Sequence, residues 1–161
     1  MDRRTVTLLE TPGHTLGTAP YVYDVHDGGR SYRAVTVGGL GLDAIENAHQ
    51  VELYLQSVAR LRALTRPTPP VQVHLTTHPF ATGLMEVRPG LAQRAPGSPN
   101  PLVDPTSFVA TLDDLAAVAR ERLAIERAKA AKPRVPKARR RSARSPRALR
   151  PPDRGRLPRS Q

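Results

Sequence analysis

The spacing of apolar residues predicts short strands at the start of the chain. Three runs rich in β-branched and aromatic residues, at 5–9, 20–25 and 32–37, have the composition of β-strands. The second and third runs are separated by residues 26–31 (HDGGRS), whose Asp-Gly-Gly sequence is typical of a tight turn. We therefore expect these two strands to form an antiparallel hairpin.

The first predicted helix follows a glycine-rich segment, residues 38–41. Asp43 is expected to cap the helix, with Glu46 three residues later in a capping-box arrangement. Three prolines at positions 67–70 end it, because proline cannot continue helical hydrogen bonding. Five apolar residues recur at i, i+3, i+4, i+7 and i+10, on one helix face: Val51, Tyr54, Leu55, Val58 and Leu61.

A further strand and a second helix complete the predicted body. Residues 71–77 have strand composition, and we expect a proline- and glycine-rich loop at 80–101. Asp104 then caps a helix with Pro105 at its first position, where a missing N–H costs nothing. The apolar face of this helix comprises Phe108, Leu112, Leu115, Ala116, Ala119 and Leu123. The order strand, hairpin, helix, strand, helix predicts an α/β fold.

The charge of the chain is concentrated at its C-terminal end. Of the 161 residues, 25 are Lys or Arg and 14 are Asp or Glu, and residues 127–161 hold 14 of the basic residues against one acid. Prolines interrupt this segment, which has few large apolar residues, so we expect residues 131–161 to form a disordered Arg/Pro-rich tail. Such a tail could bind nucleic acid or another polyanion non-specifically, or it could be a biased extension without a partner.

Composition excludes several classes of function. The chain has no cysteine, which rules out disulfides, thiol nucleophiles and every Cys-ligated metal site. No apolar run approaches the roughly 18 residues that span a bilayer. The apolar run at 5–9 is too short for the core of a secretory signal, so we expect no membrane contact and a cytoplasmic location for the chain as encoded.

Five histidines are the candidate metal ligands or general bases. His26 in the predicted turn and His49 on the predicted helix are expected to have surface or packing roles, as is His74. His74 and His78 have the H-x-x-x-H spacing of helical zinc sites, but four residues of a strand extend about 13 Å. That separation is too large for one zinc ion, whose bonds are about 2 Å long.

His14 and His78 differ from the others because each ends or follows a strand. Residues 11–18 (TPGHTLGT) place His14 in a tight turn, where proline and glycine hold a side chain outward. Residues 77–80 (THPF) end the later strand in a similar way. Strand-end loops are where ligands converge in layered α/β folds.

These motifs together resemble those of the metallo-β-lactamase superfamily. Residues 11–18 are similar to its TPGHTPG-type loop, and residues 27–30 (DGGR), 37–42 (VGGLGL) and 78–80 (HPF) continue the likeness in order. The resemblance extends over about residues 5–128 and is closest to the third subclass of metallo-β-lactamases. There a segment like residues 100–105 (NPLVDP) introduces the last helix.

The resemblance implies a zinc hydrolase with an αββα sandwich, in which two zinc ions activate a bridging hydroxide. His14 would correspond to the third histidine of one zinc site, and His78 to the late histidine of the other. The family's H-x-H-x-D-H motif does not occur in the chain, and Gly38 and Gly39 stand where a carboxylate or serine is found in relatives. We therefore expect residues 1–130 to be the C-terminal half of such a domain, inactive alone.

The implied partners are a small-molecule substrate in the complete enzyme, such as a β-lactam or a related ester or amide, and a second protein surface. Because half of a sandwich leaves an apolar face uncovered, either a complementary half-domain or a second copy of the chain could pack against it. The sequence does not favour one of these over the other.

Overall fold

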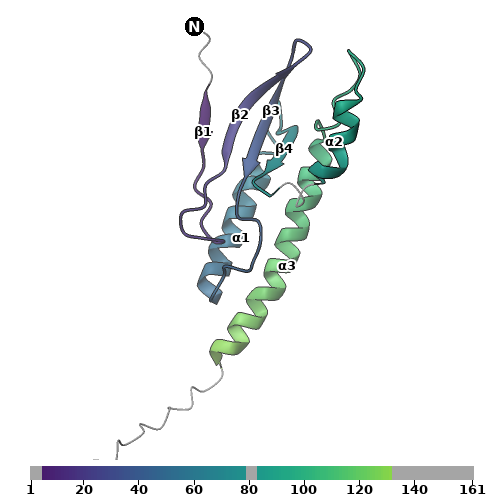
Figure 1. Ribbon diagram of the computed structural model, residues 1–161. Helices are drawn as coiled ribbons and strands as arrows, with labels where there is room; N and C mark the ends of the chain where they lie inside the picture. Colours follow the sequence, from purple (N-terminus) through teal and green to yellow (C-terminus); the bar gives the residue numbers. More distant parts are fainter. Residues whose placement is uncertain (1–4, 79–82, 132–161) are drawn as a thin grey trace, which may run out of the picture.

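The computed structural model describes residues 5–78 and 83–131 (Figure 1). In chain order, its elements are β1 (Val6–Leu8), β2 (Tyr21–Asp27), β3 (Arg30–Val37), α1 (Ala48–Ala63), β4 (Val73–Thr76), α2 (Leu84–Ala92) and α3 (Pro105–Ala131).

The four strands form one sheet in the order β1-β2-β3-β4. The first three strands are antiparallel, and β2 and β3 form the predicted hairpin, with Val22 opposite Val35. Its turn consists of Gly28 and Gly29, which have φ values of 56° and 80°, a region that favours glycine. β4 pairs parallel to β3, and α1 provides the crossover between them.

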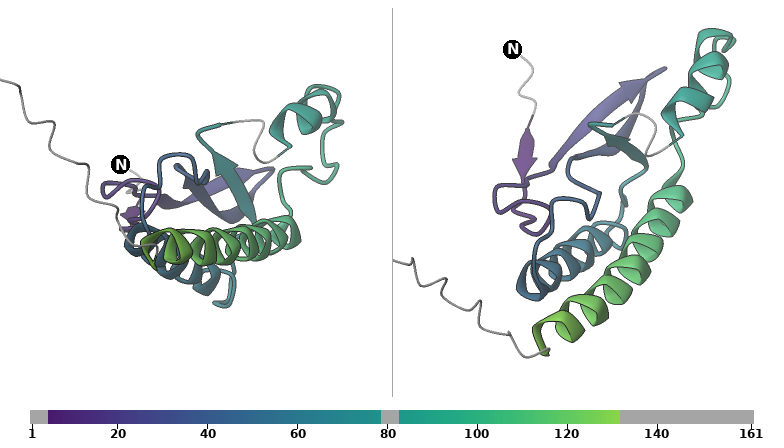
Figure 2. Two further views of the ribbon diagram at one scale, coloured as in Figure 1. Left: turned by 90° about the horizontal axis from the view of Figure 1, so that it is seen from below. Right: turned by 60° about the horizontal axis from the view of Figure 1, so that its bottom comes forward.

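Helices α1 and α3 cover one face of the sheet, as Figure 2 shows. Both predicted apolar helix faces are confirmed, since Val51, Val58, Phe108 and Leu112 are buried there. They pack against Val35 and other residues of β3 in a single core cluster. Strand residues alternate between faces, so Val35 and Val37 of β3 both contribute to this core.

The opposite face of the sheet is covered by no helix among the described residues (Figure 2). We call it the open sheet face; its strand residues are Val6, Leu8, Tyr21, Tyr23, Val25, Tyr32, Ala34, Thr36, Val73 and Leu75. None of these side chains is charged, although Val6, Leu8 and Tyr21 are exposed by 59%, 58% and 50%. Charged residues occur on this face only at the hairpin tip, where Asp27 pairs with Arg30.

The start of α1 differs from the prediction. The helix begins at Ala48 and its cap is Asn47, whose side chain accepts a hydrogen bond from the Gln50 N–H at 3.0 Å. The predicted cap, Asp43, lies in the preceding loop, where Ile45 is buried in the core. Burial of Ile45 holds residues 43–46 in a non-helical connection, so the capping-box prediction is wrong.

The predicted loop at 80–101 contains a helix that the sequence analysis missed. α2 spans Leu84–Ala92 with Pro89 inside it, and it has no buried residue. It therefore lacks the apolar periodicity by which helices are recognised. Figure 1 shows α2 on the β4 side of the sheet, away from α1.

The predicted cap of α3 is confirmed. Oδ1 of Asp104 accepts hydrogen bonds from the N–H groups of Thr106 and Ser107, at 3.0 and 3.1 Å. α3 continues to Ala131, one residue past the predicted domain boundary at 130, and the rest of the predicted tail lies outside the described residues. No described helix is both long enough and apolar enough to cross a membrane.

Candidate metal centre

The loop that carries His14 is fixed between β1 and β2 by its own hydrogen bonds. The N–H of Thr11 donates to the carbonyl of Thr18 at 2.9 Å, and the hydroxyls of Thr15 and Thr18 are 2.9 Å apart. Gly13 has a φ of 144° and lies against α1, where a Cβ would come within 2.4 Å of the Tyr54 Cα atom. The glycine of the TPGHT-type loop therefore lets the loop close directly onto the helix.

The imidazole of His14 is half-buried and held in one orientation. Its Nδ1 atom lies 2.8 Å from the carbonyl oxygen of Gly41. Because a carbonyl only accepts hydrogen bonds, Nδ1 carries the proton, and the Nε2 atom of the neutral ring keeps its lone pair. The ring also packs against Gly39, where a Cβ would lie 2.7 Å from the His14 Cδ2 atom.

His78 follows the carboxyl end of β4. Because β3 and β4 are parallel, with Val37 beside Thr76, their carboxyl ends lie at the same edge of the sheet. Beyond them, the Thr77 N–H donates to the Val37 carbonyl at 3.2 Å, and Gly38 lies against the Thr77 side chain. The Thr76 hydroxyl donates to the His78 carbonyl at 2.5 Å, and the His78 residue is exposed.

The Gly38-Gly39 turn therefore lies against His14 on one side and against Thr77, the residue before His78, on the other. His14 contacts Gly39, and the residue that precedes His78 contacts Gly38. A Cβ on Gly39 would clash with the His14 ring, so this glycine lets the ring pack directly against the turn.

The His14 arrangement fits a zinc ligand. Metal-binding histidines usually donate the other ring N–H to a carbonyl or carboxylate, which fixes the tautomer and the ring orientation. The His14–Gly41 hydrogen bond has this geometry. Within residues 5–78 and 83–131, however, no three His, Cys, Asp or Glu side chains are grouped so that they could hold a metal ion. A hydrolytic zinc needs three protein ligands, so the described residues offer only part of a site.

The other three histidines lie elsewhere. His26 is exposed on β2 and His49 is exposed on α1. His74 lies on the helix-covered face of β4, with its ring centroid 4.4 Å from that of Phe108. Its Nε2 atom is buried and has no hydrogen-bond partner in the described structure, and burial lowers the pKa of His74 to about 4. This ring packs against the core residue Phe108, which is one of the two roles, surface or packing, expected for His74.

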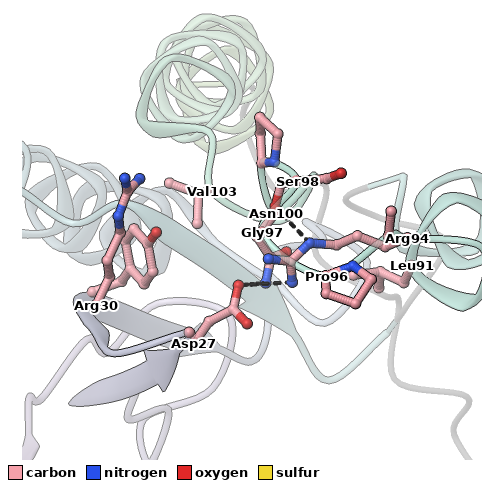
Figure 3. A pocket seen from close by; sticks show the side chains of 13 residues that line it. Asp27, Arg30, Leu91, Arg94, Pro96, Gly97, Ser98, Asn100 and Val103 are labelled. Atoms are coloured by element: carbon pink, nitrogen blue, oxygen red, sulfur yellow. Dashed lines mark hydrogen bonds and ion pairs between the residues drawn. The ribbon is translucent and has the colours of Figure 1, made fainter.

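A cavity of about 830 Å³ opens at the opposite end of the sheet, between the hairpin tip and the segment after α2 (Figure 3). Arg94 points toward Asp27 and forms an ion pair at 2.7 Å, and Asn100 donates to the same carboxylate at 3.0 Å. The hydrogen bond from Asn100, followed by those with Arg94, lowers the pKa of Asp27. The side chains of Asp27 and Arg94 thus bind each other, and this ion pair connects the segment after α2 to the hairpin.

Comparison with solved structures identifies the fold. No protein-family model and no curated protein matches the sequence. The metallo-β-lactamase BJP-1 of Bradyrhizobium japonicum, of subclass B3, is 24% identical with a TM-score of 0.66, over 81% of this chain and 48% of BJP-1. Native FEZ-1 metallo-β-lactamase of Legionella gormanii is 25% identical with a TM-score of 0.65, over 79% of this chain and 48% of FEZ-1. MEM-A1, a subclass B3 enzyme from a soil metagenome library, is 20% identical with a TM-score of 0.65, over 80% and 49% of the two chains.

The chain therefore has the metallo-β-lactamase fold in part. It spans about half the length of the structures that it matches. The likeness to the third subclass, predicted from residues 11–18 and the motifs that follow, is confirmed at the level of the fold.

Two groups around His14 were missed by the sequence analysis. One is the Gly41 carbonyl, a backbone atom that no residue type reveals. The other is Gln50 of α1, whose side-chain amide donates to the carbonyls of His14 and Ala44 at 3.1 and 3.2 Å. The only available signal was a polar residue one position before the apolar face of the helix.

Proposed function

We propose that this chain supplies the C-terminal half of a zinc-dependent hydrolase of the metallo-β-lactamase fold, in which His14 and His78 are two of the zinc ligands. The observation that carries the proposal is the hydrogen bond from His14 Nδ1 to the Gly41 carbonyl, which leaves Nε2 available. The position of Thr77, the residue before His78, beside the same glycine turn supports the proposal of His78 as the second ligand.

In the complete enzyme, zinc lowers the pKa of bound water to about 7 and polarises the bond to be cleaved. The part of this chain is to orient the His14 ring, through the hydrogen bond that its Nδ1–H donates to the Gly41 carbonyl, so that Nε2 is available to the metal. His78 contributes a second neutral imidazole from the end of β4. The remaining ligands would come from a segment with the H-x-H-x-D-H motif, which these 161 residues lack.

The open sheet face supports the half-domain interpretation. A sheet that is buried on both faces carries apolar residues on both. In a sheet with one solvated face, apolar and polar residues alternate along each strand, and the polar ones face the solvent. The open sheet face carries no charged residue between the strand ends, and its Tyr23 hydroxyl is already bonded to Thr36 at 2.8 Å. We propose that a second sheet, from a complementary half-domain, packs against it in the active enzyme.

The substrate class proposed for the complete enzyme is a β-lactam or a related ester or amide. The basis is the likeness to solved metallo-β-lactamases, and a shared fold does not by itself determine the substrate.

Zinc binding by the purified chain tests the proposal. Isothermal titration calorimetry with zinc chloride should show weak binding, which His14→Ala and His78→Ala each reduce. His49→Ala is the matched control, because His49 is also a histidine but lies exposed on α1. A chromogenic β-lactam should not be hydrolysed by the chain alone with zinc.

Two outcomes would contradict this function. Zinc binding that survives both substitutions would show that the two imidazoles are not ligands. Turnover of the β-lactam that depends on His14 and His78 would instead show that the chain is catalytic without a second half.

Polyanion binding by the C-terminal segment is a second proposed function. It is supported by the charge of residues 127–161, where 14 Lys or Arg face a single acid. Neutralised phosphates release counterions, so such binding weakens steeply with salt. The segment has no aromatic residue on which bases could stack, so the proposed binding is non-specific.

A further inference from the structure

We infer that Gln50 of α1 is a positioning residue for the His14 imidazole, and that it acts by joining the two loops that meet at the His14–Gly41 hydrogen bond. This inference deepens the proposed function and rests on it, because the orientation of the His14 ring matters for zinc binding only if His14 is a zinc ligand. The hydrogen bonds of the Gln50 side chain all go to backbone atoms, so its effect is exerted through the backbone.

The His14–Gly41 hydrogen bond joins two loops that are far apart in sequence. His14 lies in the loop before β2, and Gly41 lies in the connection between β3 and α1, 27 residues later. Neither loop fixes the relative position of the other through sheet pairing. The 2.8 Å contact therefore depends on something that holds both loops at once.

The side chain of Gln50 connects the two loops. Its Nε2 atom donates to the His14 carbonyl at 3.1 Å and to the Ala44 carbonyl at 3.2 Å. Its Oε1 atom accepts from the Glu46 N–H at 3.1 Å. Both N–H donors and one lone pair of the amide oxygen are thus engaged by the two loops.

Two further residues on the same face of α1 hold the neighbouring backbone. The Tyr54 hydroxyl donates to the Leu40 carbonyl at 2.7 Å, and the Ser57 hydroxyl donates to the Pro12 carbonyl at 2.7 Å. Burial raises the pKa of Tyr54 to about 12, so its hydroxyl remains a proton donor at neutral pH. Gln50, Tyr54 and Ser57 are spaced at i, i+4 and i+7, and so lie along one helix face.

Gln50 differs from these two because its side chain alone forms hydrogen bonds to both loops. Tyr54 binds only the later loop through its hydroxyl, and Ser57 binds only the earlier one. The later loop is also held from α3, where Arg122 donates to the Ile45 carbonyl at 2.8 Å. Loss of the Gln50 amide should therefore uncouple the loops without releasing either from the core.

The tautomer of His14 is the readout that separates positioning from general stability. In the wild-type chain without zinc, long-range ¹H–¹⁵N NMR at a pH where the ring is neutral should show the proton of His14 on Nδ1. In Gln50→Ala, the excess of this tautomer should be lost, and the Nε2 signal should move toward that of a protonated nitrogen. Gln56→Ala, an exposed glutamine on the same helix, should leave His14 unchanged.

A second variant secures the test against misfolding. Gln50→Glu keeps an oxygen acceptor for the Glu46 N–H but, as a carboxylate, has no N–H for the two carbonyls. It should shift the His14 tautomer as Gln50→Ala does, with circular dichroism like that of the wild type. An unchanged Nδ1–H tautomer in folded Gln50→Ala or Gln50→Glu protein would overturn the inference.

The zinc titration then distinguishes this inference from the proposed function. Because the tautomer is measured without metal, its dependence on Gln50 is independent of zinc binding. Suppose that the His14 tautomer depends on Gln50 but that His14→Ala binds zinc as the wild type does. This result would overturn the proposed function and leave the positioning role intact.

Discussion

The buried ring of His74 should make the stability of the fold depend on pH. Burial against Phe108, without a hydrogen-bond partner for Nε2 in the described structure, lowers the pKa of His74 from 6.5 to about 4. The unfolded chain therefore binds a proton at a higher pH than the folded chain. The stability from the neutral ring is complete above pH 6.5 and is lost as the pH falls toward 4.

The size of the effect follows from the two pKa values. Linkage gives a loss of about 2 kcal/mol between pH 8 and pH 5, and about 3 kcal/mol once the pH is below 4. His74→Leu keeps an apolar side chain beside Phe108 and cannot be protonated. The free energy of unfolding of this variant, relative to wild type, should therefore rise by about 2 kcal/mol from pH 8 to pH 5.

Urea unfolding followed by circular dichroism at several pH values measures this difference. His49→Leu is the control, since its ring is exposed to solvent in the folded chain as in the unfolded one, and it should follow the wild-type pH dependence. Parallel curves for wild type and His74→Leu between pH 8 and pH 5 would refute the reasoning, because His74 would then have the same pKa in both states.

Three further predictions concern the open sheet face, the C-terminal segment and the cap of α3. Leu8→Lys should reduce binding of a hydrophobic dye and self-association in light scattering, because it places a charge on the open sheet face; Val118→Lys, at an exposed apolar residue of α3, should not. Deletion of residues 132–161 should abolish retention on immobilised DNA at low salt. Asp104→Ala should lower the free energy of unfolding by about 1 kcal/mol in urea titrations, because two N–H groups lose their acceptor.

Each of these predictions has a clear contrary result. Equal loss of dye binding in the Leu8 and Val118 variants would mean that the open sheet face is not the surface that binds the dye. DNA retention that survives the deletion would eliminate the C-terminal segment as the polyanion site. Unchanged stability of Asp104→Ala would mean that solvent replaces the cap without cost.

Local signals in the sequence were sufficient to predict structure where one or two residues determine the backbone conformation. Gly28 and Gly29 predict the hairpin turn because both need positive φ, and Asp104 before Pro105 predicts the start of α3. The apolar faces of α1 and α3 were predictable for a related reason, since burial imposes helical spacing on whole segments.

Tertiary packing decided the features that the sequence analysis missed. Asp43 is a favourable capping residue, but Ile45 is buried in a non-helical segment, so the helix is capped by Asn47 and begins at Ala48. α2 has a proline inside it and no buried face, so no periodic pattern marks it. The role of Gln50 depends on two loops meeting, which local sequence does not encode.

The candidate site was predictable only in part. The turn chemistry of residues 11–18 identified His14 as an outward-held side chain, and the structure adds the acceptor that orients its ring. The position of Thr77, the residue before His78, beside Gly38 follows from the parallel pairing of β3 and β4, which required the crossover through α1 to be known.

The response of the individual histidines to zinc tests the central claim most directly. In the full chain, zinc should shift or broaden the imidazole NMR signals of His14 and His78 at the same added concentration, while His26 and His49 stay unchanged until far more metal is present. Such coincidence would mean that the two rings share one metal-binding cleft. A response of only one of these two rings, or of neither, would contradict the account.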